Sequence, residues 1–84
     1  MTLVERAQAV QTREDFAGFV AELKADLDAH RDAWENADLS SFLEAMAAWL
    51  HDMEGYYKNT GQNLQDVSPW RLLADTLMAA RVYE

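Results

Sequence analysis

Histidine and carboxylate side chains on one helical face are the first candidates for chemistry in this chain. Glu44, His51 and Glu54 are separated by steps of seven and three residues, so a helix would place them roughly on one side. Helical di-iron proteins use paired Glu-x-x-His motifs, whereas this chain has one His-x-x-Glu and only two histidines. We therefore interpret these residues as a polar outer stripe and predict no metal site.

Asp26 and His30, four residues apart, are the second candidate, because a carboxylate and an imidazole can act as an acid/base couple. A histidine at a helix end is more often a favourable charge at the negative end of the helix dipole. No nucleophile, oxyanion donor or glycine-rich phosphate loop is marked nearby, and the chain has no cysteine. The sequence therefore predicts a non-enzymatic protein with no catalytic, cofactor-binding or metal residue.

The segment 52–59 combines acidic and aromatic residues and is the best candidate for a working surface. Adjacent residues of a helix point about 100° apart, so Tyr56 and Tyr57 cannot be equally buried. Tyrosine rings beside acids suit a basic protein partner. The alternative is one tyrosine in the core and one idly exposed. The predicted partner-binding residues are Asp52, Glu54, Tyr56, Tyr57, Lys58 and Asn59.

Apolar residues at helical spacing predict three main helices that would position these side chains, over residues 12–29, 39–59 and 68–82. Thr2 and Glu5 have the form of a capping box, which allows a short fourth helix at the N-terminus. Asn36 or Asp38 can cap the 39–59 helix, whose apolar pattern is the strongest and which we expect at the centre of the core.

The whole composition indicates one folded domain over residues 1–84. Half of the 84 residues are hydrophobic, no stretch alternates as a strand would, and a chain of this length supports a single core. We expect an all-α fold, a compact bundle of three main helices with the short fourth as an option. A domain this small buries a modest share of its surface, so homodimerisation through apolar helix faces remains an alternative.

The net charge and the targeting signals limit which partners and which location we expect. The net charge of −8 repels nucleic acid and anionic membranes, and it attracts basic proteins. We find no secretory signal pattern and no apolar run long enough to span a membrane, so a cytoplasmic location is expected.

Two tryptophans stand at or near helix starts, Trp34 and Trp70. An indole at such a place can plug the end of a bundle, with its N–H on a loop carbonyl. The alternative is that these rings anchor a protein interface, where tryptophan is a common hot spot. Both interpretations remain open from the sequence.

A resemblance joins several of these motifs. The chain resembles the signature of a family of small uncharacterised bacterial domains. The residues that carry this likeness are, in order, Trp34-Glu35-Asn36, Leu39, Phe42-Leu43-Glu44-Ala45-Met46, Trp49, Asp52, Tyr56-Tyr57, Asn59, Pro69-Trp70, Ala79-Ala80 and Tyr83-Glu84. This likeness covers nearly the whole chain and implies a bacterial source without an assigned activity. Asp52, Tyr56-Tyr57 and Ser68-Pro69 are also similar to the immunity proteins of DNase colicins, although Lys58 stands where that family has proline.

The expected function is a protein-binding module, and its most concrete form is an immunity or antitoxin-like protein. Such a protein would block a basic toxin through Asp52, Glu54 and the two tyrosines. The alternative is a small structural or regulatory domain that acts through homodimerisation.

Overall fold

The protein is described by a computed structural model over residues 2–83. Helices and short 3-10 turns follow one another along this range, and no strand occurs within it. The all-α prediction is confirmed, and the short N-terminal helix is present. The elements are α1 (Leu3–Ala9), α2 (Arg13–Ala29), η1 (Arg31–Ala33), α3 (Leu39–Asn59), η2 (Leu64–Asp66) and α4 (Pro69–Ala80).

Local side chains set the ends of these helices. The Thr12 hydroxyl accepts the backbone N–H of Asp15 at 3.1 Å, and the Asp15 carboxylate accepts the backbone N–H of Thr12 at 3.3 Å, which completes a capping box. The Asp38 carboxylate accepts the backbone N–H of Ser41 at 2.8 Å and so begins α3. After α3, Gly61 adopts φ +76, a left-handed conformation that glycine takes without strain.

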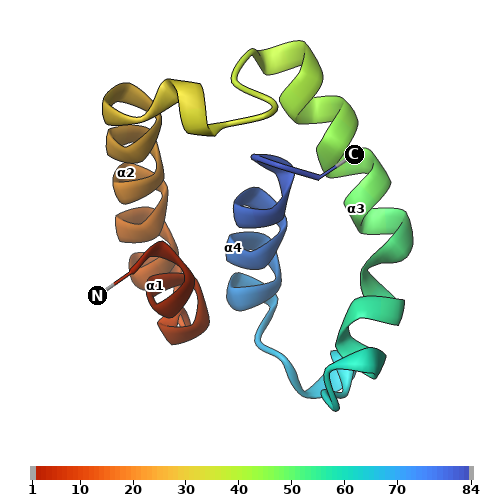
Figure 1. The fold of residues 1–84 in the computed structure, drawn as a ribbon. Helices are drawn as coiled ribbons and strands as arrows, with labels where there is room; N and C mark the ends of the chain where they lie inside the picture. The colour runs from red at the N-terminus through yellow and green to blue at the C-terminus, as the bar shows by residue number, and fades with distance from the viewer. Residues whose placement is uncertain (1, 84) are drawn as a thin grey trace.

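Helix α4 is the central element of the fold. Figure 1 shows α1 and α2 together on one side of α4 and α3 on the other side. Within residues 2–83, α3 packs against α4 and η2 but not against α1 or α2. The prediction that the 39–59 helix forms the centre of the core is therefore wrong. Helix α4 takes this place because Arg71 and Asp75 are its only charged residues, and a helix that is apolar almost all round is buried on several sides.

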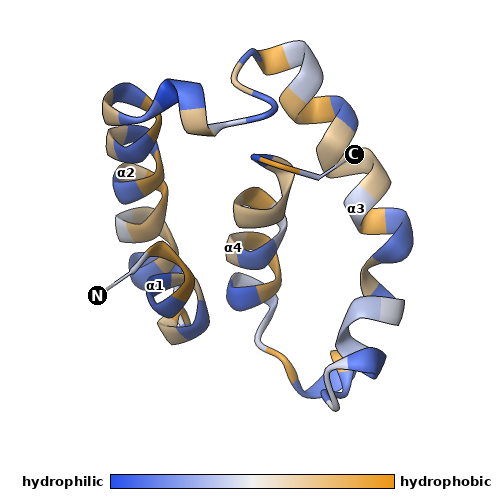
Figure 2. Ribbon diagram, in the orientation of Figure 1, coloured by the Kyte–Doolittle hydropathy of each residue, from blue (hydrophilic) through white to orange (hydrophobic). Residues whose placement is uncertain are grey.

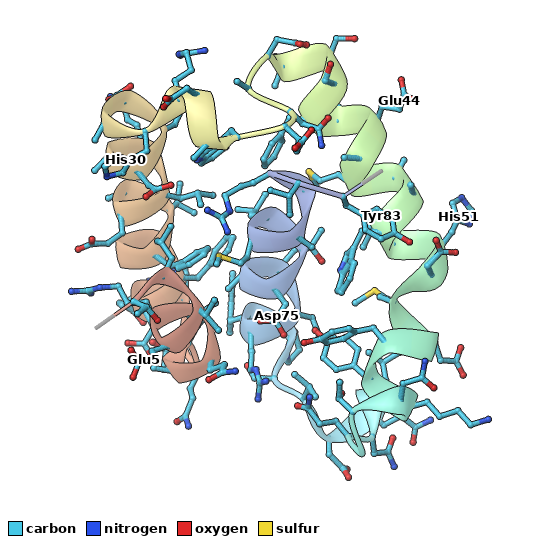
Figure 3. The ribbon with its side chains drawn as sticks, viewed as in Figure 1. Glu5, His30, Glu44, His51, Asp75 and Tyr83 are labelled. Carbon is cyan, nitrogen blue, oxygen red and sulfur yellow. The ribbon has the colours of Figure 1, made fainter. Side chains whose placement is uncertain are left out.

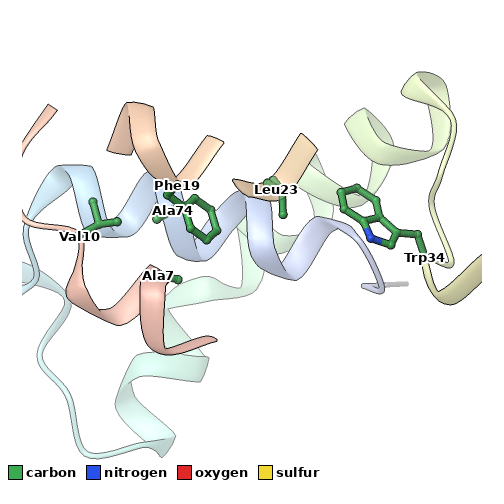
Figure 4. Packing of buried hydrophobic residues seen from close by; sticks show 6 residues of the cluster. All are labelled: Ala7, Val10, Phe19, Leu23, Trp34 and Ala74. Carbon is green, nitrogen blue, oxygen red and sulfur yellow. The ribbon is translucent and has the colours of Figure 1, made fainter. Parts of the chain in front are cut away.

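The main core lies between α4 and the α1–α2 pair. Figure 2 shows the apolar residues of α2 on its side toward α4. Small side chains on α1 and α4 let the helices approach closely, while Phe19, Leu23 and Trp34 fill the space between them (Figure 4). The buried cluster consists of Ala7, Val10, Phe19, Leu23, Trp34 and Ala74.

Asn36 ties the connector between α2 and α3 to the C-terminal residues. Its side-chain Nδ2 donates to the backbone oxygens of Ala80 at 3.0 Å and Tyr83 at 2.9 Å. Its backbone N–H donates to the oxygen of Arg81 at 2.9 Å. Asn36 thus satisfies carbonyl groups at the end of α4, which have no partner within the helix. Of the two residues predicted to cap α3, Asp38 alone caps the helix.

No helix within residues 2–83 is both long and apolar enough to cross a membrane.

Candidate functional site

The residues first considered for metal and acid/base chemistry lie apart or make structural bonds. Glu44 and His51 project from the side of α3 that faces away from α4 (Figure 3), and Glu54 is also exposed. In the part of the chain that the structure describes, no three histidine or acidic side chains gather closely enough to hold a metal ion. The Asp26 carboxylate accepts the indole N–H of Trp34 at 2.8 Å, while His30 is exposed.

The structure separates the two tyrosines of the predicted partner surface. Tyr57 has no exposed surface, whereas 46% of Tyr56 is exposed. The ring centroids lie 5.1 Å apart with the rings edge to face. The expectation that the rings differ in burial is confirmed, but the inclusion of Tyr57 among surface residues is corrected. Tyr57 belongs to the core because its hydroxyl finds a buried acceptor, which lets the whole ring leave water.

The other predicted partner-binding residues fall on two different sides of α3. Two residues along a helix correspond to a rotation of about 200°, so Asp52 and Glu54 point in nearly opposite directions. Asp52, Tyr56 and Asn59 share one side, and the Asp52 carboxylate accepts the hydroxyl of Tyr83. Glu54 and Lys58 share the other side. The fold therefore does not bring the six residues together as one surface.

Tyr57 belongs to a polar network between α3 and α4. Its hydroxyl donates to Asp75 Oδ2 at 2.5 Å, and Arg71 Nε lies 3.5 Å from the same oxygen. Arg71 Nη2 donates to Gln62 Oε1 at 3.1 Å. Burial, opposed by the Tyr57 hydroxyl and Arg71, raises the pKa of Asp75. Burial also raises the pKa of Tyr57, so the phenol stays protonated and donates to the carboxylate.

The raised pKa of Asp75 predicts a specific pH dependence of stability. Between the ordinary value of 3.8 and the higher folded value, the folded state binds more protons at this site than the unfolded state. This site therefore loses stability as pH rises through that window. We expect the stability of Asp75→Asn relative to the wild type to improve with rising pH and then level off, measured by urea unfolding from about pH 3 to about pH 7.

Asp28→Asn is the matched control with the opposite sign. The hydrogen bond and charge of Lys24 lower the pKa of Asp28, so the stability that this carboxylate contributes is present at higher pH and is lost as pH falls. The deficit of Asp28→Asn should accordingly shrink toward low pH. Parallel pH curves for the wild type and Asp75→Asn would contradict the assignment of a raised pKa to Asp75.

A stripe of leucines on α3 is uncovered, although the sequence pattern treats these residues as core. Leu39, Leu43 and Leu50 are exposed by 72%, 52% and 49%. Their spacing places them within about 40° of one another on the helix. They are uncovered because α3 packs on a single helix. The apolar arc of α3 is wider than one neighbouring helix can cover, and this width is the sequence signal that some of its apolar residues stay exposed.

The carboxylates of α3 have no cationic partner among the described residues. The ion pairs within residues 2–83 join Arg6 to Glu22, Arg13 to Glu14, Lys24 to Asp28, Arg71 to Asp75 and Arg81 to Asp26. None of these pairs includes Glu44, Asp52 or Glu54. The favourable spacing of Glu54 and Lys58 predicts an ion pair, but the structure does not form it. Helix α3 thus presents negative charge that no ion pair within residues 2–83 neutralises.

The structure places the two tryptophans in different surroundings. Trp34 is 8% exposed, stacks on Phe42 with ring centroids 5.9 Å apart, and donates its N–H to Asp26. Of the two interpretations of Trp34, the core plug is confirmed, with a carboxylate in place of a loop carbonyl. Trp70 is half-buried against Phe16 at 6.0 Å.

These features define a small all-α domain built around one central helix, with an uncovered apolar and acidic side on α3. The model of a family of unknown function, DUF7660, matches residues 12–84, so the chain belongs to that family. This match confirms the resemblance to a family of small uncharacterised domains. The bacterial source and the likeness to colicin immunity proteins stay predictions. No curated protein and no solved structure matches the chain.

Proposed function

We propose that this domain is a non-enzymatic protein-binding module that recognises a basic protein through the outer side of α3. The observation that carries the proposal is the uncovered stripe of Leu39, Leu43 and Leu50 on a helix whose carboxylates lack cationic partners. An apolar centre with a charged rim is the usual composition of a protein interface.

The charge of the chain favours a basic partner over a second copy. Each copy carries a net charge of −8, so two copies that meet at α3 would bring acidic surfaces together. A basic partner would instead gain attraction from Glu54, which lies beside Leu50 one helical turn later. The same field would raise the association rate with such a partner at low salt.

The more specific form of the proposal is an immunity or antitoxin-like role against a basic toxin. An acidic helical protein could occupy the cationic surface with which such a toxin binds its target. Asp52 and Tyr56 point away from the leucine stripe, so of the residues first predicted to bind the partner, Glu54 lies beside the stripe and these two do not. Tyr57 contributes only by holding α3 on α4.

The test is capture of a partner from the source cells by the purified, tagged chain. We expect a basic protein to be retained, and we expect Leu43→Ser combined with Leu50→Ser to reduce its retention by about tenfold or more. Glu54→Lys should weaken retention further, and added salt should weaken it in the wild type. Because both leucines are half exposed, the double variant should stay folded, which circular dichroism checks.

Val20→Ser is the matched control. This residue is 40% exposed and lies on α2, which does not pack against α3, so retention should not change. Equal retention by all variants would remove α3 as the partner surface. A wild-type dimer in analytical ultracentrifugation that Leu43→Ser and Leu50→Ser dissociate would replace the proposal by homodimerisation.

A further inference from the structure

A pocket opens at the N-terminal end of the leucine stripe, between the end of α2 and the start of α3. Its volume is about 270 Å³, and its lining is almost entirely apolar. Leu23 and Leu27 come from α2, Trp34 from the connector, and Leu39 and Phe42 from α3. Pockets for drug-sized molecules begin at roughly 300 Å³, so this pocket suits a single large side chain.

The wall of this pocket can be reached from solvent. Leu39 is 72% exposed, and Leu27, Ala37 and Phe42 are each partly exposed. Leu39 belongs both to the pocket and to the leucine stripe, so the two form one continuous apolar surface. The partner surface proposed for α3 therefore ends in a pocket that a side chain of the partner can enter.

The spacing of the stripe favours a helix as the segment that covers it. Leu39, Leu43 and Leu50 are separated by four and seven residues, which correspond to about 6 Å and about 10.5 Å along α3. A second helix laid alongside presents side chains of one face at the same steps. In a strand, about 10.5 Å corresponds to three residues, and an odd number of residues turns the side chain to the opposite face.

Carboxylates without an ion-pair partner stand at both ends of this apolar row. Asp38 lines the mouth of the pocket next to Leu39, and Glu54 follows Leu50 by one helical turn. Neither carboxylate takes part in an ion pair within residues 2–83. A covering helix would therefore gain from cations placed on either side of its own apolar row.

The cations near this row are paired or lie farther from it. Lys24 also lines the pocket, but its Nζ lies 2.6 Å from Asp28 Oδ2. Lys58 lies one helical turn beyond Glu54 and farther around α3 from the stripe. The pocket mouth thus keeps the negative charge of Asp38.

We propose that the basic partner presents a cationic amphipathic helix along α3, with its apolar side on the leucine stripe, one large side chain in the pocket and cations toward Asp38 and Glu54. Helix recognition of this kind uses apolar anchors at helical spacing. The inference rests on the proposed function, because it specifies the segment of the partner that α3 recognises.

The probe is a synthetic peptide of leucine and lysine, about 18 residues or five turns long, whose leucines share one helical side. The readout is the ¹H–¹⁵N spectrum of the wild-type protein. We expect saturable shifts of the Leu39 and Leu43 backbone signals, and of Leu27, which lies on the opposite wall of the pocket. An unmoved Leu27 signal would remove the pocket from the site.

A peptide of the same composition, with its leucines spread around the helix, is the matched probe. It carries the same charge but no apolar side, so it should bind about tenfold more weakly. Equal affinity for the two peptides would show that charge alone attracts them and would overturn the proposal. Absence of saturable binding of the first peptide would overturn it as well.

Leu39→Ser tests the residue shared by stripe and pocket. It should weaken binding of the first peptide by about tenfold, and the residue is exposed enough for the variant to stay folded. Val4→Ser is the control, since Val4 is 51% exposed on α1, which does not pack against α3. Unchanged affinity in Leu39→Ser would overturn the proposal.

Glu54→Lys and Glu44→Lys change the net charge equally but at different places on α3. Glu54 lies beside the stripe, whereas Glu44 lies farther around the helix, so the first variant should weaken binding of the peptide more. Equal effects would remove Glu54 as a contact of the helix.

The peptide and capture experiments can fail separately. If capture of a basic protein depends on Leu43 and Leu50 but the peptide does not bind, the partner surface stays and the inference of a helix is wrong. If the peptide binds in a manner that requires Leu39 but no captured protein depends on these leucines, the proposed function fails.

Discussion

Replacement of Tyr57 by alanine is expected to lower the free energy of unfolding by about 3 to 5 kcal/mol, the range for removal of a large buried side chain. Tyr56→Ala, at the neighbouring position, should cost about 1 kcal/mol or less, because 46% of Tyr56 is exposed. Urea unfolding followed by circular dichroism measures both values. For a domain of this size, the first loss is a large share of the total stability.

The large effect of Tyr57 follows from the way α3 is attached. Among the helices and 3-10 turns of residues 2–83, α3 packs only on α4 and η2, so few other contacts near Tyr57 can replace a lost buried ring. The alanine would also leave Asp75 without the hydroxyl that donates to it at 2.5 Å. A buried acceptor that loses its donor adds a desolvation cost to the loss of packing.

Tyr57→Phe separates these two contributions. It keeps the ring and removes only the hydroxyl, so its cost should be about 1 to 3 kcal/mol, smaller than that of the alanine variant. If Tyr56→Ala destabilised the protein more than Tyr57→Ala, Tyr56 and not Tyr57 would be the buried ring. The orientation of α3 on α4 would then be wrong.

The helix bounds could be predicted from the sequence because the signals that set them are local. Thr12 and Asp15 cap each other across three residues, and Gly61 ends α3 through its own backbone conformation. Such interactions depend on a few neighbouring residues. The 12–29 and 39–59 helices accordingly lie close to their predicted ranges.

The place of each helix in the fold could not be predicted in the same way. Helix α3 has the strongest apolar pattern, yet α4 is the central helix, because packing depends on which faces meet in space. The pattern shows that Leu43 and Leu50 are apolar, but it does not show that no other helix covers them. The same limit applies to Tyr56 and Tyr57. Their adjacency predicts unequal burial, and the tertiary partner Asp75 decides which ring is buried.

The residues that carry the family resemblance mostly join distant parts of the fold. Asn36 binds the backbone of Ala80 and Tyr83, and Tyr83 in turn donates its hydroxyl to Asp52 on α3. The terminal motif therefore connects the start of α3 and its middle to the end of α4. The same signature also includes Leu39 and Leu43, which are exposed, so it is not confined to residues that hold the fold together.

Trp34→Ala is the second substitution with a large expected effect. The residue is 8% exposed. The guanidinium carbon of Arg81, which follows α4, lies 5.7 Å from the centroid of the Trp34 ring. Removal of the indole would open a cavity beside Phe42 and leave Asp26 without the N–H that it accepts at 2.8 Å. We expect a loss of about 3 to 5 kcal/mol in the free energy of unfolding, measured by urea titration.

Trp70→Ala provides the comparison. Because Trp70 is half-buried, its replacement should lower the free energy of unfolding by only about 1 to 2 kcal/mol. Trp34→Phe retains the stacking on Phe42 but not the bond to Asp26, so its cost should lie between those of the two alanine variants. A different result would change the role of Trp34. If Trp34→Ala left the unfolding midpoint unchanged and abolished partner capture, the indole would be an interface anchor, because a core plug cannot be removed without loss of stability.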